Sequence, residues 1–160
     1  NPAAFETEQI DPVESLYELY DRTKRLAESK GVRLTLTVPE YDVAPVITNE
    51  DRLQQVLTIL LDNAIKFTPA GGQITLGLEA TNRGARFFVR DTGVGMDAET
   101  RRHCFDRFHQ GDKSHPASGS GLGLAIAREI MTRLGARLTV RSELGEGSEF
   151  SFTLRQENQA

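Results

Sequence analysis

One long amphipathic stretch, residues 50–67, constrains the fold of this chain more than any other segment. At about 100° per residue, its apolar side chains fall on one face of a helix. That face consists of Leu53, Val56, Leu57, Leu60, Leu61 and Ala64. A helix with one apolar stripe must bury it against a second layer. Asn63 lies at the rim of the stripe, with Lys66 and Phe67 one turn further on, so polar chemistry is expected at the edge of a buried face.

Two further helices and several short strands surround this stretch. Asp11 and Pro12 begin a helix that Gly31 ends, and a third helix runs over 123–134 until Gly135. A short helix is expected over 97–107. Strand-like segments occupy 8–10, 32–39, 45–48, 73–80, 85–91, 136–142 and 148–154.

Most neighbouring strands in this pattern are joined as hairpins rather than through helices. The sequence therefore predicts an α+β fold, a two-layer α/β sandwich in which one mixed, mostly antiparallel sheet packs against three main helices. A doubly wound parallel sheet would show strict alternation of strand and helix, so the pattern favours the sandwich over it.

Composition narrows the classes of protein to consider. The chain has 160 residues, 38% hydrophobic and 26% charged, which fits one globular domain. A net charge of −4 argues against nucleic acid as a partner. The single Cys104 excludes an internal disulfide, and no apolar run approaches the length of a membrane span.

Two glycine-rich segments are candidates for ligand binding. Asp91 ends a predicted strand and is followed by Gly93 and Gly95, so a carboxylate stands where backbone can approach a flat ligand closely. The segment 119–124, Gly-Ser-Gly-Leu-Gly-Leu, opens a helix, where unpaired N–H groups and the helix dipole favour a phosphate. A tight turn with a surface Asp and a flexible hinge are the alternatives for the two segments taken singly.

Better-known phosphate motifs do not fit these segments. A dinucleotide fingerprint needs its third glycine one residue later, where Leu124 stands, and must directly follow a strand. A P-loop needs Gly-Lys followed by Ser or Thr, which the chain lacks. The glycine-rich segments thus belong to a different kind of nucleotide site, or to none.

Asn63 fits such a site because its neutral amide oxygen suits Mg²⁺, which keeps several waters and binds substrate phosphates. Lys66 supplies a point charge for the same phosphates, and Phe67 offers a face or edge to a base or ribose. Taken one at a time, each residue is better explained as an ordinary helix residue: a hydrogen-bonded Asn, a solvated Lys and a core Phe. Their coincidence with two glycine-rich segments favours a magnesium–nucleotide site.

Four segments together resemble the catalytic and ATP-binding domain of bacterial sensor histidine kinases, in the wider family that includes gyrase, the chaperone Hsp90 and the repair protein MutL. Residues 51–68 resemble the N box, 91–96 the G1 box, 105–108 the F box and 119–130 the G2 box. Residues 142–154 are similar to the closing strands of the family. The resemblance covers nearly all of 11–154 and implies a Bergerat-type ATP-binding fold.

The resemblance implies a role for each residue at the base of the nucleotide. Asp91 would accept a hydrogen bond from the adenine amine, and Gly93 and Gly95 would shape the adenine pocket. Phe67 would lie beside the nucleotide. Ser148 resembles the hydroxyl residue that assists the aspartate through water.

At the phosphate end, the resemblance makes Asn63 the Mg²⁺ ligand and Lys66 a phosphate contact. Lys113 lies where the ATP lid of the family often has a basic residue that reaches the γ-phosphate. Phe105 and Phe108 would anchor the lid by burial. The segment that wraps the phosphates would comprise Gly119, Gly121, Leu122 and Gly123.

One position departs from the family pattern. The N box commonly has a polar residue four before the Mg²⁺-binding Asn, and in the hydrolytic relatives that residue is a Glu which activates water. Here it is Ile59, whose side chain neither accepts a proton nor binds a metal. This argues against a self-sufficient ATP hydrolase. Two alternatives remain. One is a hydrolytic ATPase, and the other is a degenerate kinase module that only binds nucleotide or signals through protein contacts.

The phosphoacceptor is missing from this sequence. Such kinases phosphorylate a His that precedes an acidic residue on a separate dimeric helical segment, whereas His103, His109 and His115 precede Cys, Gln and Pro. We expect residues 1–10 to be the remnant of a linker, 11–156 to be the catalytic domain and 157–160 a tail. The implied ligands are ATP and Mg²⁺.

The implied protein partners are the dimerisation helices of the same kinase and a downstream response regulator. The fragment itself is expected to be monomeric. The resemblance implies a cytoplasmic location for this domain, whether or not its parent protein is anchored in a membrane.

Overall fold

A computed structural model describes residues 5–107 and 122–157 of the chain. In chain order its elements are β1 (Glu8–Ile10), α1 (Pro12–Ser29), β2 (Arg33–Thr37), β3 (Val46–Thr48), α2 (Glu50–Phe67), β4 (Gln73–Thr81), β5 (Gly84–Asp91), α3 (Ala98–His103), α4 (Gly123–Arg133), β6 (Thr139–Glu143) and β7 (Gly147–Leu154).

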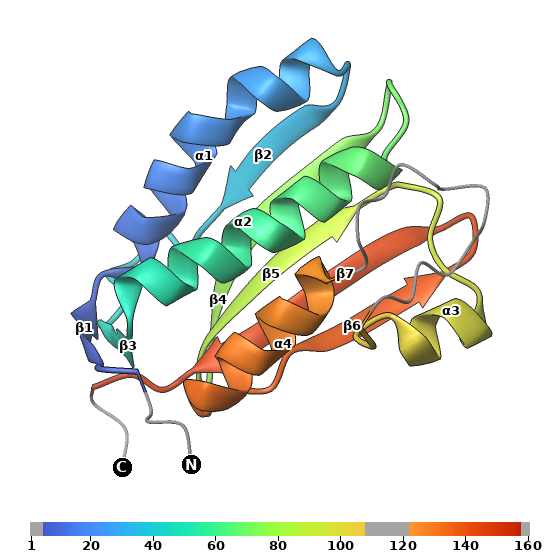
Figure 1. Cartoon of the computed structure of the whole chain (residues 1–160). Helices are drawn as coiled ribbons and strands as arrows, with labels where there is room; N and C mark the ends of the chain where they lie inside the picture. The colour runs from blue at the N-terminus through green and yellow to red at the C-terminus, as the bar shows by residue number, and fades with distance from the viewer. Residues whose placement is uncertain (1–4, 108–121, 158–160) are drawn as a thin grey trace.

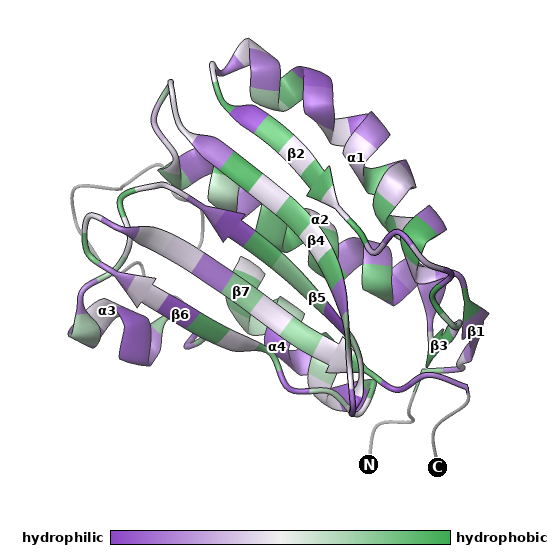
Figure 2. Cartoon of the chain, turned by 180° about the vertical axis from the view of Figure 1, so that it is seen from behind, coloured by the Kyte–Doolittle hydropathy of each residue, from purple (hydrophilic) through white to green (hydrophobic). Residues whose placement is uncertain are grey.

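The main sheet has five strands in the order β2-β4-β5-β7-β6. Only β2 and β4 run parallel; every other neighbouring pair is antiparallel. Helices α1, α2 and α4 lie against one face (Figure 1), and Figure 2 shows the opposite face without a helix over it. The predicted α+β sandwich with a mixed, mostly antiparallel sheet and three main helices is confirmed.

The core lies between the helix layer and the sheet. The predicted stripe of α2 is entirely buried, since Leu53, Val56, Leu57, Leu60, Leu61 and Ala64 are each at most 1% exposed. Alternate residues of the central strands meet it, among them Ile74, Leu76, Phe87, Val89, Phe150 and Phe152. This packing holds the end of α2 over the end of β5, where Asp91 stands.

The structure adds a small second sheet that the sequence pattern does not indicate. The expected short strand at 8–10 is β1, which pairs antiparallel with β3. On its other side β3 meets the end of the chain: Ile47 N–H donates to the Arg155 carbonyl (2.8 Å), and Glu157 N–H donates to the Pro45 carbonyl (3.0 Å). Residues 8–10, expected in the linker, are thereby joined to the segment that leaves β7.

Several elements are shorter than the sequence predicts. The strand expected from residue 136 begins at Thr139, because Gly135 takes a φ of 80° and Ala136 N–H returns to the Met131 carbonyl of α4. The helix expected over 97–107 covers only Ala98–His103, where Asp97 accepts the Thr100 N–H as N-cap. Across residues 5–107 and 122–157, none of the helices combines the length and the apolar character needed to cross a bilayer.

Phe5 fastens the first described residues to the helices. Its half-buried ring lies under the guanidinium groups of Arg52 (5.0 Å) and Arg133 (5.8 Å), which come from α2 and α4. Nearby, the Asn49 side chain donates to the Glu6 carbonyl (2.9 Å). The segment before β1 is therefore held by three side chains from the helix layer.

Replacing Phe5 with Ala is expected to lower the free energy of unfolding by about 1–2 kcal/mol, because apolar burial and two cation–π contacts are lost. Urea denaturation measures this change, and amide exchange of Glu8–Ile10 should accelerate. Tyr17→Ala, at a side chain that is 51% exposed, serves as the control. Equal losses in the two variants would contradict the anchoring role of Phe5.

Candidate nucleotide site

Asp91 is a buried carboxylate at the end of the central strand β5, only 6% exposed. Its Oδ1 accepts the N–H groups of Gly93 (2.8 Å) and Ser148 (3.3 Å). Burial raises the pKa of Asp91, and these two hydrogen bonds oppose that effect in part. Within the part of the chain that the structure describes, no protein donor reaches Oδ2, so that oxygen is available to a ligand donor.

The loop after Asp91 is wedged between two other segments. Val94 N–H donates to the Phe67 carbonyl at the end of α2 (3.1 Å). On the other side, Gly145 N–H donates to the Val94 carbonyl (2.7 Å) from the turn between β6 and β7. The loop therefore connects the helix layer to the closing hairpin.

The two glycines of this loop are required by close backbone approach. A Cβ on Gly93 would lie 2.3 Å from the Phe67 carbonyl oxygen. Gly95 has a φ of 69°, and a Cβ there would lie 2.0 Å from the Glu143 carbonyl oxygen. Both distances exclude a side chain, so these glycines set how closely the loop packs beside Asp91.

Ser148 lies opposite Asp91 in the β5–β7 pair, so the two side chains share one face of the sheet. Its hydroxyl lies 2.8 Å from the hydroxyl of Ser142, on β6. Ser142 is not among the residues predicted from the sequence, although the sequence carries a signal for it. The short turn after residue 143 places Ser142 and Ser148 opposite each other on adjacent strands.

The last two turns of α2 carry the predicted phosphate-end residues. Asn63 is half-buried, and among the residues described by the structure its side-chain amide makes no hydrogen bond. Lys66 is exposed on the following turn. Because the Phe67 carbonyl is bonded to the loop after Asp91, the predicted base-end and phosphate-end residues are parts of one connected arrangement.

The start of α4 lies beside the same stretch of α2. A Cβ on Gly123 would lie 3.4 Å from Cγ2 of Ile59, one turn before Asn63. Leu122 takes the N-cap position without a side-chain hydrogen bond to the first turn. Among the described residues, no side chain caps the N–H groups of that turn, and such groups at a helix start can bind an anion.

Phe105, predicted to anchor the lid, packs edge-on against Phe150 of β7 with ring centroids 6.0 Å apart. Phe108, Lys113, Gly119 and Gly121 lie outside the described residues, as do His109 and His115. Of the predicted phosphate-wrapping segment, only Leu122 and Gly123 are therefore placed.

Other reactive side chains near this region are engaged or buried. Burial raises the pKa of the Cys104 thiol to about 11, so it is not a nucleophile at neutral pH. His103 Nδ1 lies 2.8 Å from Asp106. Across the described parts of the chain, no three His, Cys, Asp or Glu side chains form a group that could hold a metal ion.

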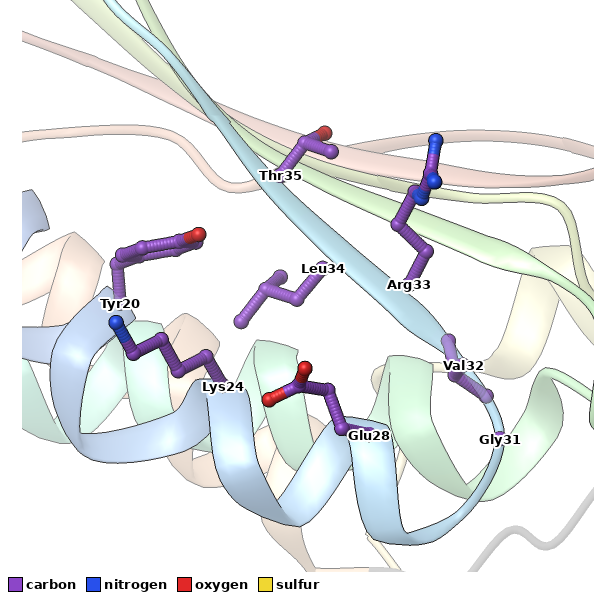
Figure 3. A pocket seen from close by; sticks show the side chains of 8 residues that line it. All are labelled: Tyr20, Lys24, Glu28, Gly31, Val32, Arg33, Leu34 and Thr35. Carbon is purple, nitrogen blue, oxygen red and sulfur yellow. The ribbon is translucent and has the colours of Figure 1, made fainter.

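A separate hollow lies between α1 and the edge strand β2. In Figure 3, Tyr20, Lys24 and Glu28 rise from α1 and Leu34 points toward them, while Arg33 and Thr35 point to the other side of the strand. The Lys24 ammonium lies over the Tyr20 ring (5.5 Å) and near Asp21 (3.7 Å). The lining includes none of the predicted site residues, so we assign no function to this hollow.

The chain is similar to proteins of one known family. Residues 48–158 match the model of the histidine kinase-, DNA gyrase B-, and HSP90-like ATPase family. The chain is 36% identical over 155 residues to the adaptive-response sensory kinase SasA of Synechococcus elongatus, covering 93% of this chain and 40% of that protein. It is 34% identical over 158 residues to the aerobic respiration control sensor protein ArcB of Escherichia coli, covering 94% of this chain and 20% of that protein.

Solved structures give the same result. Full-length ShkA in complex with AMPPNP superposes with a TM-score of 0.83 at 32% identity, over 96% of this chain and 33% of that one. The catalytic domain of histidine kinase ThkA superposes with a TM-score of 0.82 at 24% identity, over 95% of this chain and 97% of that one, which supports the fold.

The chain spans less than half the length of the curated relatives named here. It belongs to the histidine kinase-, DNA gyrase B-, and HSP90-like ATPase family, and its relatives are sensor histidine kinases.

Proposed function

We propose that this domain binds ATP with Mg²⁺ and transfers the γ-phosphoryl group to a histidine on a separate helical segment. The observation that carries the proposal is Asp91: a buried carboxylate whose Oδ1 is occupied by two backbone N–H groups and whose Oδ2 is available. A carboxylate held in this way selects a ligand with an N–H donor, such as the amino group of adenine. The AMPPNP bound by ShkA, a relative, is consistent with this assignment.

At the other end of the nucleotide, we assign the triphosphate to the space between α2 and the start of α4. The uncapped N–H groups after Leu122 would bind phosphate oxygens, and Lys66 would add a positive charge. Lys113, Gly119 and Gly121 remain predicted phosphate contacts from the sequence alone. Asn63 fits Mg²⁺ because its half-buried amide oxygen is not used by the described protein groups.

Phosphoryl transfer depends on positioning and charge neutralisation more than on covalent help from the protein. Bound Mg²⁺ would neutralise charge on the phosphates. The acceptor imidazole must come from another segment, because none of His103, His109 and His115 precedes an acidic residue. A dimerisation segment of the same kinase is the proposed partner, with a response regulator downstream and a cytoplasmic location.

Ile59 distinguishes this proposal from a hydrolytic ATPase. A Cβ added to Gly123 would lie 3.4 Å from Cγ2 of Ile59, so this side chain faces the start of α4. By resemblance, its position is that of the water-activating acid of the hydrolytic relatives, and an apolar side chain cannot activate water. Steady phosphate release by the isolated domain, lost in Asn63→Asp, would instead favour hydrolysis. A degenerate module would either bind no nucleotide or bind it without transferring phosphate.

Two measurements test the proposed function in sequence. Titration calorimetry with AMPPNP and Mg²⁺ is expected to show binding by the isolated domain. ATP and a separately supplied dimerisation segment are then expected to yield an acid-labile phosphohistidine on that segment. No binding at millimolar nucleotide, or binding without phosphohistidine, would overturn the kinase assignment.

Replacing Asn63 with Ala is expected to weaken binding of AMPPNP about tenfold in the presence of Mg²⁺, because a metal ligand is lost. Binding without Mg²⁺ should change little. Asp62→Asn, at the exposed neighbouring position of α2, is the control and should preserve the effect of Mg²⁺. If Asn63→Ala loses the same AMPPNP affinity with and without Mg²⁺, Asn63 is not a ligand of the metal.

A further inference from the structure

We propose that Ser142 is a positioning residue that makes the Ser148 hydroxyl a hydrogen-bond acceptor toward the nucleotide base, and thereby favours 6-amino over 6-oxo purines. The inference rests on the proposed nucleotide site and adds a specificity determinant to it. It concerns a serine on β6 that is not in the set predicted from the sequence.

The Ser142 hydroxyl is buried, with the residue only 7% exposed, and it has three protein partners. It accepts the N–H of Met96 (2.9 Å), from the loop after Asp91. It donates to the carbonyl oxygen of Gly147 (3.0 Å), which can only accept. The Ser148 hydroxyl lies 2.8 Å away as the third partner.

The valence of a hydroxyl group decides the direction of this third bond. A serine hydroxyl has one proton to donate and two lone pairs to accept with. The Gly147 carbonyl takes the proton of Ser142, and Met96 uses one lone pair. The remaining lone pair must accept from Ser148. The Ser148 proton is therefore directed at Ser142, and is not available to a base beside Asp91.

The direction of this bond determines whether Ser148 presents a hydrogen-bond donor or an acceptor to a ligand. Ser148 pairs with Asp91 across the β5–β7 ladder, and its N–H donates to Asp91 Oδ1. With its proton engaged, Ser148 Oγ presents lone pairs next to the Asp91 carboxylate. The two residues thus form an edge of acceptors, which matches an amino group with two N–H donors and repels a carbonyl oxygen at the same position.

The same hairpin contains a matched control. Thr139 and Ser151 form a second hydroxyl pair across β6 and β7 (3.1 Å), on the other face of the sheet. Ser151 is as buried as Ser142, at 8% exposed. Removing its hydroxyl disturbs the same two strands without touching the Asp91 side.

The test compares dissociation constants of ATP and inosine triphosphate, whose base carries a carbonyl where adenine has its amino group. Wild type is expected to prefer ATP. In Ser142→Ala the Ser148 hydroxyl is free to turn and donate, so the preference for ATP should fall about five- to tenfold, the worth of one hydrogen bond. Ser151→Ala should keep the wild-type preference.

A double-variant cycle separates positioning from loss of structure. Because Ser142 acts through Ser148, the double variant Ser142→Ala/Ser148→Ala should show the same preference for ATP over inosine triphosphate as Ser148→Ala alone. If Ser142→Ala proves too unstable, Ser142→Cys fills the same space with a group that hydrogen-bonds weakly, and the same fall in preference is expected.

The outcomes distinguish this inference from the proposed function. ATP binding with a preference that Ser142→Ala and Ser142→Cys leave unchanged overturns the role of Ser142 alone. An equal fall in Ser151→Ala would also overturn it, because the effect would then come from general loosening of the hairpin. No ATP binding by the wild type would overturn the proposed function, and this inference with it.

Discussion

Replacing Asp91 with Asn is expected to weaken ATP binding more than about hundredfold. The substitution keeps an oxygen that can accept from Gly93 and Ser148, so the local backbone geometry is retained. It replaces Oδ2 with an amino group, which would face the adenine amino group donor to donor. Losing a charge-assisted hydrogen bond and leaving a buried donor unpaired together cost about 3 kcal/mol or more. Titration calorimetry of the variant with Mg²⁺ and AMPPNP measures the loss.

The same variant is expected to be more stable than the wild type without nucleotide. Burial raises the pKa of Asp91, so the ionised form is disfavoured in the folded state and the folded protein binds this proton more tightly than the unfolded chain. The wild type therefore loses stability relative to Asp91→Asn as the pH rises from about 4 through the raised pKa. At lower pH, where Asp91 is protonated in both states, the difference should vanish.

Urea denaturation of the two proteins across this pH range measures the difference. Asp42→Asn, at an exposed position between β2 and β3, is the control and should follow the wild type. If Asp91→Asn binds ATP as tightly as the wild type in the calorimetric titration, Asp91 does not contact the nucleotide. A stability difference that shrinks as the pH rises would contradict the raised pKa.

Gly147→Ala is expected to destabilise the domain by about 3 kcal/mol and to abolish nucleotide binding. Gly147 has a φ of 91°, and an added Cβ would lie 2.0 Å from the Asp91 carbonyl oxygen. Backbone strain and the clash each cost on the order of 1–3 kcal/mol. Relieving the clash moves the start of β7 away from Asp91, next to the Asp91–Ser148 pair.

Gly145→Ala isolates the strain from the clash. Gly145 lies in the same turn with a φ of 83°, but an added Cβ would meet nothing within 4 Å. This control is expected to lose only about 1 kcal/mol and to retain nucleotide binding. Denaturation midpoints and calorimetry of the two variants test the difference. Equal losses would show that close packing of Gly147 on Asp91 is unimportant.

Much of the fold follows from local patterns in the chain. The stripe from Leu53 to Ala64 predicts the central helix because only one face of it can be buried, and Asn49 and Pro69 mark where it begins and ends. Alternation predicts the strands, and hairpin spacing predicts that most of them are antiparallel. These signals depend on neighbours a few residues apart, so no tertiary information is needed to interpret them.

The small sheet was not predictable in the same way. β3 is three residues long, and its partners, β1 and residues 155–157, are distant from it in sequence. No short-range pattern specifies which strand pairs with it. The late start of β6 has a different cause: Ala136 N–H bonds to the Met131 carbonyl of α4, and the strand begins only at Thr139.

For the site, the sequence by itself determined the residue types: an acid at a strand end, glycines after it, and an amide and a lysine at the rim of a buried helix face. Resemblance to a family then implied a role for each. What only the tertiary structure decided is how these groups are held, such as the Phe67 carbonyl bonded to Val94 and the three partners of the Ser142 hydroxyl. Those contacts join β6, β7, the end of α2 and the loop after Asp91. The directions of hydrogen bonds between such distant segments depend on the packed arrangement, which no local pattern encodes.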